Sequence, residues 1–204
     1  MSLEPVKVSD SLRKIPHTAS SEHLIDLGND RIAEFMLSSE ETIENFVTCD
    51  FHLIDLAMTW LHENHLITGN NFCEFGSGYG VVTLLAADRG MKSVGIEIEP
   101  TLVERSTALA AELNLDAEFY CGSFIPRDIG DLTELAADVE NVDTHQGDIY
   151  KEIGLEMADF DLMFAFPWPG EGGFFEAVFD AGAASGALLM TYRGRDGVSV
   201  VRKT

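Results

Sequence analysis

The sequence predicts an α/β fold, in which a doubly wound, mostly parallel sheet follows an N-terminal layer of helices. Three observations lead to this prediction. Apolar residues recur every three to four positions from residue 23 to residue 67, which is typical of amphipathic helices. After residue 70, short apolar runs alternate with helix-like segments, a pattern that builds parallel sheets through right-handed crossovers. A glycine-rich turn directly follows the first apolar run.

The chain of 204 residues has the length of one domain. Residues 1–21 have no clear periodicity, and we expect them to form a flexible N-terminal tail. Residues 22–204 are then expected to form a single domain, with N-terminal helices over residues 22–69. An insertion is expected over residues 125–158, because this stretch is longer than one crossover needs. It contains a helix-like piece over residues 131–139.

Each later element has its own local signals. The parallel strands are expected over residues 71–75, 93–97, 117–121, 160–166 and 188–193, and the helices between them over residues 81–89, 101–113 and 171–183. Gly90 is a typical helix stop, and Pro100 suits the first turn of the helix that follows it. After the fifth strand, the turn Gly194-Arg195-Asp196-Gly197 leads into residues 198–202, a short antiparallel edge strand.

The turn after the first strand predicts a nucleotide-like ligand. Gly76, Gly78 and Gly80 let a ligand approach the backbone at the start of a helix. A dinucleotide fingerprint would need its third glycine where Val81 stands, so the spacing disfavours NAD. Glu97 ends the second strand 21 residues after Gly76, where an acidic side chain can accept hydrogen bonds from both ribose hydroxyls.

These residues resemble class I S-adenosylmethionine-dependent methyltransferases. The segment Glu74-Phe75-Gly76-Ser77-Gly78-Tyr79-Gly80 matches the family's E/D-x-G-x-G-x-G loop, and Glu97 matches its ribose-binding acid. The resemblance extends over about residues 49–190. It implies a Rossmann-like fold with strand order 3-2-1-4-5 and S-adenosyl-L-methionine as cofactor. The cofactor-binding residues it implies are Glu74, Phe75, Gly76, Ser77, Gly78, Gly80, Glu97, Ile98, Ser123, Phe124 and Phe166.

Two positions compete for the adenine amino group after the third strand. Ser123 and Phe124 are preferred, because one helix of ordinary length separates them from Glu97. Asp148 matches the family's Gly-Asp pair more strictly, and with that choice the insertion would precede the third strand. Both assignments stay open at this point.

The acceptor is expected beyond the fourth strand, at Phe166-Pro167-Trp168-Pro169. The prolines stiffen this loop, which either forms the acceptor pocket or only covers the sheet edge. The resembled family often carries Asp/Asn-Pro-Pro-aromatic here in enzymes that methylate amino nitrogens. This chain lacks the acidic or amide residue, which leaves the acceptor atom unsettled. The candidate catalytic residues are Glu171, Trp168 and Pro167.

Two further groups that could deprotonate an acceptor are Tyr192 and Asp50, although Asp50 is more typical of a helix N-cap. Metal binding is not expected, because His62, Glu63 and His65 lack the H-E-x-x-H spacing. The three cysteines form no C-x-x-C pair and are expected to be reduced. No apolar stretch has the length of a membrane span, so a cytoplasmic protein is expected.

Charge restricts the acceptor. The 35 Asp and Glu residues against 13 Lys and Arg give a net charge of −22. Such a surface repels phosphate backbones, so a nucleic-acid acceptor is not expected, and a small molecule or a lysine-rich protein is favoured. The acidity is equally consistent with a role in solubility alone.

The predicted function is methyl transfer from S-adenosylmethionine to a small-molecule or protein side-chain acceptor. Two alternatives remain open, a non-catalytic S-adenosylmethionine-binding regulatory or interaction protein and a nucleotide-dependent oxidoreductase. The sequence makes no prediction of the oligomeric state.

Overall fold

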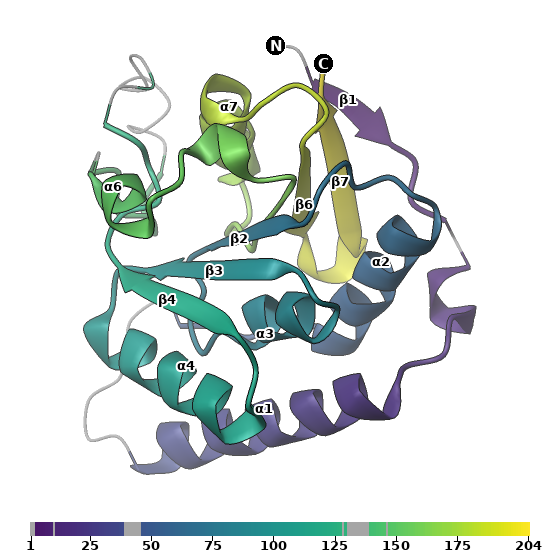
Figure 1. Ribbon diagram of the computed structural model, residues 1–204, viewed down its shortest axis with the longest axis vertical. Coiled ribbons are helices and arrows are strands. Elements are labelled where there is room, and N and C mark those ends of the chain that lie inside the picture. The colour runs from purple at the N-terminus through teal and green to yellow at the C-terminus, as the bar shows by residue number, and fades with distance from the viewer. Residues whose placement is uncertain (1–2, 10, 39–45, 128, 130–138, 146) are drawn as a thin grey trace.

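The computed structural model describes residues 3–9, 11–38, 46–127, 129, 139–145 and 147–204 (Figure 1). Within these residues one sheet has the strand order β1-β7-β6-β5-β2-β3-β4. The strands are β1 (Leu3–Val6), β2 (Asn71–Phe75), β3 (Lys92–Glu97), β4 (Ala117–Cys121), β5 (Leu162–Ala165), β6 (Leu188–Tyr192) and β7 (Val198–Lys203).

The five strands β2 to β6 are parallel, and their spatial order is the predicted 3-2-1-4-5 when they are counted from β2. Phe75 lies opposite Ile96 of β3 and Ala165 of β5. The carboxyl ends of the three central strands therefore meet at one edge of the sheet, where open α/β sheets bind their ligands. Beyond β6, strand β7 runs antiparallel, as predicted.

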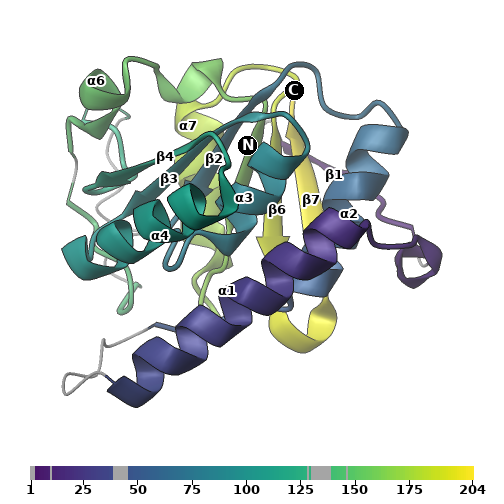
Figure 2. The same cartoon turned by 60° about the horizontal axis from the view of Figure 1, so that its bottom comes forward.

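Helices cover both faces of the sheet (Figures 1 and 2). They are α1 (Ala19–Ser38), α2 (Phe51–Glu63), α3 (Val81–Asp88), α4 (Pro100–Leu113), α6 (Ile149–Ile153) and α7 (Gly172–Gly182), with 3-10 turns η1 (Leu12–Lys14), η2 (Met157–Asp159) and η3 (Gly194–Asp196). No helix among the described residues combines the length and hydrophobicity of a membrane span.

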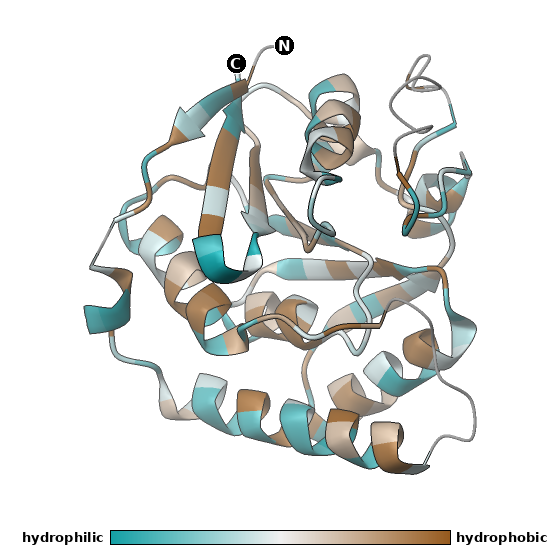
Figure 3. Ribbon diagram, turned by 180° about the vertical axis from the view of Figure 1, so that it is seen from behind, coloured by the Kyte–Doolittle hydropathy of each residue, from teal (hydrophilic) through white to brown (hydrophobic). Residues whose placement is uncertain are grey.

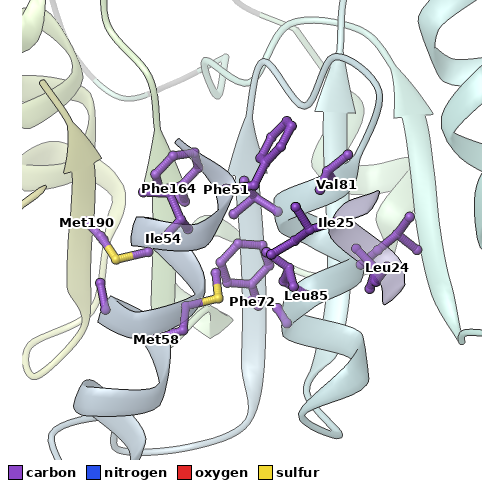
Figure 4. Packing of buried hydrophobic residues seen from close by; sticks show 14 of the residues in the cluster. Leu24, Ile25, Phe51, Ile54, Met58, Phe72, Val81, Leu85, Phe164 and Met190 are labelled. Carbon is purple, nitrogen blue, oxygen red and sulfur yellow. The ribbon is translucent and has the colours of Figure 1, made fainter. Parts of the chain in front are cut away.

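The core has two parts because side chains alternate across the strands. Phe72 of β2 packs with residues of α1 to α4, whereas its neighbour Cys73 packs on the opposite face with residues of α6 and α7. Figure 4 shows Phe72 between Met58 of α2 and Leu85 of α3. Along α1, polar and apolar residues follow one another (Figure 3), and its buried residues recur at helical spacing. The predicted N-terminal helical layer thus lies on one side of the sheet, where α2 contacts β7 and α1 packs on α2 and α3.

The N-terminal segment differs from the prediction of a flexible tail over residues 1–21. Leu3–Val6 form β1, which pairs antiparallel with β7, with Leu3 opposite Lys203. Leu12 of the following 3-10 turn is buried, and α1 already begins at Ala19. The strand satisfies backbone groups of β7 that would otherwise lie at the sheet edge. The sheet therefore has two strands beyond β6, since β7 runs antiparallel to β6 and β1 runs antiparallel to β7. Strand β1 comes from the opposite end of the chain.

The long connection after β4 also contains regular structure. Pro126 forms a parallel bridge with Gly147, and α6 follows. The Tyr150 hydroxyl of α6 donates a hydrogen bond to the Phe124 carbonyl oxygen at 2.7 Å. Because β4 comprises Ala117–Cys121, the extra residues follow the third parallel strand. The helix predicted over residues 131–139 lies outside the described residues, except for its last residue.

Candidate functional site

A pocket of about 440 Å3 opens at the carboxyl ends of the central strands. Its described wall comes from several parts of the chain. The loops after β2, β3 and β4 contribute Glu74 to Tyr79, Glu97 to Glu99, and Gly122 to Phe124. The loop after β5 contributes Phe166, Trp168 and Glu171, and the insertion contributes Glu140 to Asp143. The segment before α2 adds Phe46 to Cys49.

The three glycines of the loop after β2 all have positive φ angles, of 71°, 52° and 75°. A Cβ on Gly76 would meet no protein atom within 4 Å, so this position leaves open space in the pocket wall. A Cβ on Gly80 would lie 2.4 Å from Cε1 of Phe119, and Gly80 itself lies outside the pocket wall. Gly76 therefore leaves room for a ligand, whereas Gly80 permits the packing of α3 against β4.

Ser77 has a side chain without a partner. Its Oγ is buried in the pocket wall and makes no hydrogen bond. Its backbone nitrogen is satisfied, since it donates to the Ile96 carbonyl oxygen at 3.0 Å. Because buried polar atoms are almost always paired, this hydroxyl is a candidate partner for a ligand in the pocket.

Glu97 lies beneath the glycine loop and is 8% exposed. Oε2 accepts a hydrogen bond from the Gly78 nitrogen at 2.7 Å, and Oε1 accepts from the nitrogens of Ile98 and Glu99 at 2.8 and 3.1 Å. Burial raises the pKa of Glu97, and these three N–H groups oppose that rise. A carboxylate has about four acceptor positions, so Glu97 keeps capacity to accept from a ligand.

Glu74 is deeper than the sequence indicated and is tied to α3. Its Oε2 accepts hydrogen bonds from the backbone nitrogen of Thr83 at 2.9 Å and from Thr83 Oγ1 at 2.6 Å. Burial raises the pKa of Glu74 to about 8, although the bonds from Thr83 oppose this shift. The residue therefore joins the two ends of the glycine loop and also forms part of the pocket wall.

The structure separates the two candidates for the adenine end. Ser123 and Phe124 line the pocket, and the Phe124 ring stacks on Phe75 with 4.7 Å between ring centroids. Asp148 lies outside the pocket wall and pairs with Arg127 at 3.0 Å and with Lys151 at 3.3 Å. Ser123 and Phe124 are thus the residues at the pocket.

Ile98 is 45% exposed and also belongs to the pocket wall, as Phe166 does.

Glu171 ties the loop after β5 to the insertion. Its Oε1 accepts hydrogen bonds from the Glu140 nitrogen at 3.0 Å, the Asn141 nitrogen at 3.0 Å and Asn141 Nδ2 at 2.9 Å. Its Oε2 is buried and has no hydrogen-bond partner. Trp168 lies in the pocket wall with Glu171, whereas Pro167 lies outside it.

Sequence reasoning missed two parts of the wall. Phe46 precedes α2 and packs against Phe35 and Tyr79, with 6.4 and 6.2 Å between ring centroids. Asn141 of the insertion holds Glu171. Tyr79 lies within the glycine motif and could have been inferred from it. Phe46 and Asn141 have no local signal, because they reach the pocket through contacts far apart in sequence.

The other candidate groups lie elsewhere. Asp50 is exposed and caps α2, with its side chain accepting from the Leu53 nitrogen at 3.0 Å. Tyr192 lies outside the pocket wall and packs edge-on against Phe166. His62, Glu63 and His65 are exposed, and the described residues contain no group of three or more His, Cys, Asp or Glu side chains that could hold a metal ion.

The three cysteines are free thiols. Cys73 is buried, Cys49 lines the pocket, and Cys121 is exposed. Burial raises the pKa of the Cys49 thiol well above its ordinary value.

No protein-family model matches this chain, and no curated protein matches its sequence. Solved structures do match. An RNA methyltransferase from Salinibacter ruber, in complex with S-adenosyl-L-homocysteine, aligns with a TM-score of 0.50 and 17% identity over 77% of this chain and 92% of its own. A hypothetical protein from Thermus thermophilus aligns with a TM-score of 0.55 and 15% identity over 81% of this chain and 93% of its own. The chain therefore has the Rossmann-like fold of class I S-adenosylmethionine-dependent methyltransferases.

Proposed function

We propose that this protein transfers a methyl group from S-adenosylmethionine to a small-molecule or protein side-chain acceptor. The observation that carries the proposal is the pairing of Glu97 with the glycine loop. The carboxylate accepts a hydrogen bond from Gly78 at 2.7 Å and faces a pocket that has room beside Gly76. In doubly wound folds an acid at this strand end binds ribose hydroxyls.

The residues of the pocket fit this cofactor. Gly76 leaves space for the methionine portion, and the free Ser77 Oγ supplies a hydrogen-bonding group beside it. Ser123 and Phe124 form the end assigned to the adenine, with Ile98 at its exposed side. When bound, this cofactor would offer a methyl group attached to a positively charged sulfur, so that the lone pair of an acceptor could attack the methyl carbon with the sulfur as leaving group.

The charge of the pocket also suits a cationic cofactor. Its wall contains the acidic side chains of Glu97, Glu99, Glu140, Asp143 and Glu171, and no Lys, Arg or His lines it among the described residues. Such a wall favours a sulfonium over ligands with several phosphates. This charge distribution weighs against a nucleotide-dependent oxidoreductase, in addition to the missing third glycine.

The chain contributes chiefly by positioning. Strands β2 and β5 are paired, so the glycine loop and the loop after β5 lie next to each other. An acceptor held at Trp168 and Glu171 would lie beside the methionine portion of the cofactor. Holding reacting groups close and aligned provides a large part of the rate enhancement in such displacements.

The acceptor class is part of the proposal. A protein of similar fold from Salinibacter ruber is an RNA methyltransferase, so the fold alone does not exclude a nucleic-acid acceptor. The net charge of −22 is the argument against one in this chain.

Calorimetry with S-adenosylmethionine, S-adenosylhomocysteine and NAD in parallel tests the proposal. We expect the first two to bind and Glu97→Ala to weaken both by about tenfold or more. Glu104→Ala, an exposed residue of α4, is the matched control and should bind as the wild type does. Absence of binding of the first two compounds would overturn the proposal. A labelled-methyl screen over cell extract then separates an enzyme from a non-catalytic binding protein.

A further inference from the structure

Glu171 has a carboxylate with one saturated oxygen and one free oxygen. The side chain is 5% exposed, and three N–H donors from residues 140 and 141 bond to Oε1. Oε2 is buried without a partner. Among the described residues, only two side-chain N or O atoms are buried without a partner, Glu171 Oε2 and Ser77 Oγ, and both residues line the same pocket. A buried carboxylate oxygen without a donor is costly, which makes Oε2 a candidate acceptor for a donor on a ligand.

The surroundings of Glu171 favour a positively charged donor. Glu140 and Asp143 line the same pocket, and no basic side chain lines its described wall. The aromatic residue Trp168, three positions before Glu171, lines the same pocket. Aromatic faces attract cations, and carboxylates repel phosphates and other carboxylates.

Glu171 is also held apart from the residues assigned to the cofactor. Its hydrogen-bond partners belong to the insertion, whereas Glu97 bonds to the glycine loop and Glu74 bonds to Thr83 of α3. The loop that carries Glu171 nevertheless follows β5, whose Ala165 lies opposite Phe75. A ligand at Glu171 would therefore lie next to the glycine loop without sharing its contacts.

We propose that Glu171 recognises the acceptor and that the acceptor is a primary or secondary amine, either a free molecule or a side chain. The amine nitrogen donates a hydrogen bond to Glu171 Oε2. This inference rests on the methyltransferase function proposed above, because it assigns the substrate class of that reaction.

Glu171 Oε2 also accepts the proton that an alkylammonium acceptor must lose before methylation. An alkylammonium ion has no lone pair, so it first gives one proton to Glu171 Oε2. The nitrogen lone pair then forms a bond to the methyl carbon while the carbon–sulfur bond breaks, and its electron pair stays on sulfur. The positive charge moves from sulfur to nitrogen. Glu171 returns to its ionised form by releasing its proton to water, so each transfer releases one proton in total.

Binding measurements on the protein saturated with S-adenosylhomocysteine test this assignment. The probes are butylamine, phenethylamine and Nα-acetyl-lysine amide, each compared with a neutral partner, namely butanol, 2-phenylethanol and Nα-acetyl-norleucine amide. We expect at least one amine to bind more than about tenfold tighter than its neutral partner, since a charged hydrogen bond is at stake.

The decisive variant is Glu171→Gln. Glutamine keeps an oxygen that can accept the three bonds from residues 140 and 141, but it replaces the free oxygen with an NH2 group. We expect amine binding to weaken by about tenfold or more, with the affinity for S-adenosylhomocysteine unchanged within about twofold. The control is Glu176→Gln on α7, which pairs with Arg193 at 2.8 Å outside the pocket and should change neither affinity.

Three results would overturn the inference. All three amines could bind no better than their neutral partners. Glu171→Gln could leave amine binding intact. Glu171→Gln could also weaken the binding of S-adenosylhomocysteine as much as the binding of the amine. The last result would place Glu171 in the cofactor site. Failure of the wild type to bind S-adenosylhomocysteine is a separate outcome, because it overturns the proposed function itself.

Discussion

Two hydrogen bonds join Glu74 to Thr83, one from the Thr83 nitrogen at 2.9 Å and one from Thr83 Oγ1 at 2.6 Å, and both end on the same carboxylate oxygen. Glu74 belongs to β2 and Thr83 to α3, so the pair closes the chain on either side of residues 76–80. The glycine loop is therefore held at both ends by one buried contact. This arrangement keeps a glycine-rich backbone in a single conformation despite its freedom.

We expect Thr83→Val to lower the free energy of unfolding by about 1 to 3 kcal/mol, because it removes one donor to a buried carboxyl group and keeps the side-chain shape. Urea unfolding at pH 7 measures the change. Thr107→Val, at an exposed position of α4, removes a hydroxyl that bonds to its own helix and is the matched control. Equal losses in the two variants would contradict the structural role of the pair.

Glu74 also makes stability depend on pH. Its pKa in the folded protein is about 8, above the ordinary 4.5, so the folded state keeps a proton that the unfolded state has released. The contribution of Glu74 is fully present below pH 4.5 and is lost as the pH rises toward 8, by at most about 1.4 kcal/mol per pH unit. Glu74→Gln lacks this titration.

Urea unfolding of the wild type and Glu74→Gln at pH 5, 7 and 9 tests this dependence. The wild type should lose stability relative to the variant across this range. A difference between the two proteins that stays constant from pH 5 to pH 9 would contradict the raised pKa.

A buried ion pair anchors the helical layer. Asp55 of α2 is 1% exposed and accepts hydrogen bonds from Arg89 after α3 and from His17 Nδ1, the latter at 2.5 Å. We expect Arg89→Met to lower the free energy of unfolding by about 3 kcal/mol, because it removes the guanidinium group that pairs with the buried Asp55 carboxylate. Arg31→Met, which breaks an exposed pair with Glu112, should leave the urea midpoint close to that of the wild type. Similar midpoints for both variants would contradict the difference in burial.

Substitutions at Gly76 and Gly80 should affect different properties, namely ligand binding and folding stability. Gly76→Ala places a methyl group in the open pocket, and Gly80→Ala forces one against Phe119. Both add the strain of a positive φ, about 1 to 2 kcal/mol. Gly90→Ala has a φ of 78° and no atom within 4 Å of its Cβ, so it measures that strain alone.

We expect Gly76→Ala to unfold like Gly90→Ala and to bind S-adenosylhomocysteine more weakly. Gly80→Ala should be less stable than either, because its methyl group overlaps the Phe119 ring. Calorimetry and urea unfolding of the three variants give both quantities. Unchanged binding in Gly76→Ala would remove this glycine from the cofactor site.

The parallel core of the fold could be predicted because its signals are local. The apolar run at residues 71–75, the alternating glycines and the helix that follows lie within about twenty residues of each other, and spacing alone leads on to Glu97. Such patterns report backbone requirements that hold in any α/β sheet.

Strand β1 and the details of the pocket could not be predicted, because they depend on contacts between residues that are far apart in the sequence. Strand β1 is only Leu3–Val6, too short to show alternation and interrupted by Pro5, and its partner β7 lies at the other end of the sequence. Glu171 was a candidate through its position after β5, but its free oxygen follows from bonds to residues 140 and 141, about thirty positions away. No periodicity in the insertion indicates which residues reach it.

The pairing of β1 with β7 brings the first and last described strands of the chain side by side. Leu3 lies opposite Lys203, so the two ends meet at the amino-terminal side of the parallel strands, away from the edge where the pocket opens. A short linker could join these ends and new ends could be opened at an exposed turn, with the order of the parallel strands preserved. Surface attachment through either end would likewise leave the pocket accessible.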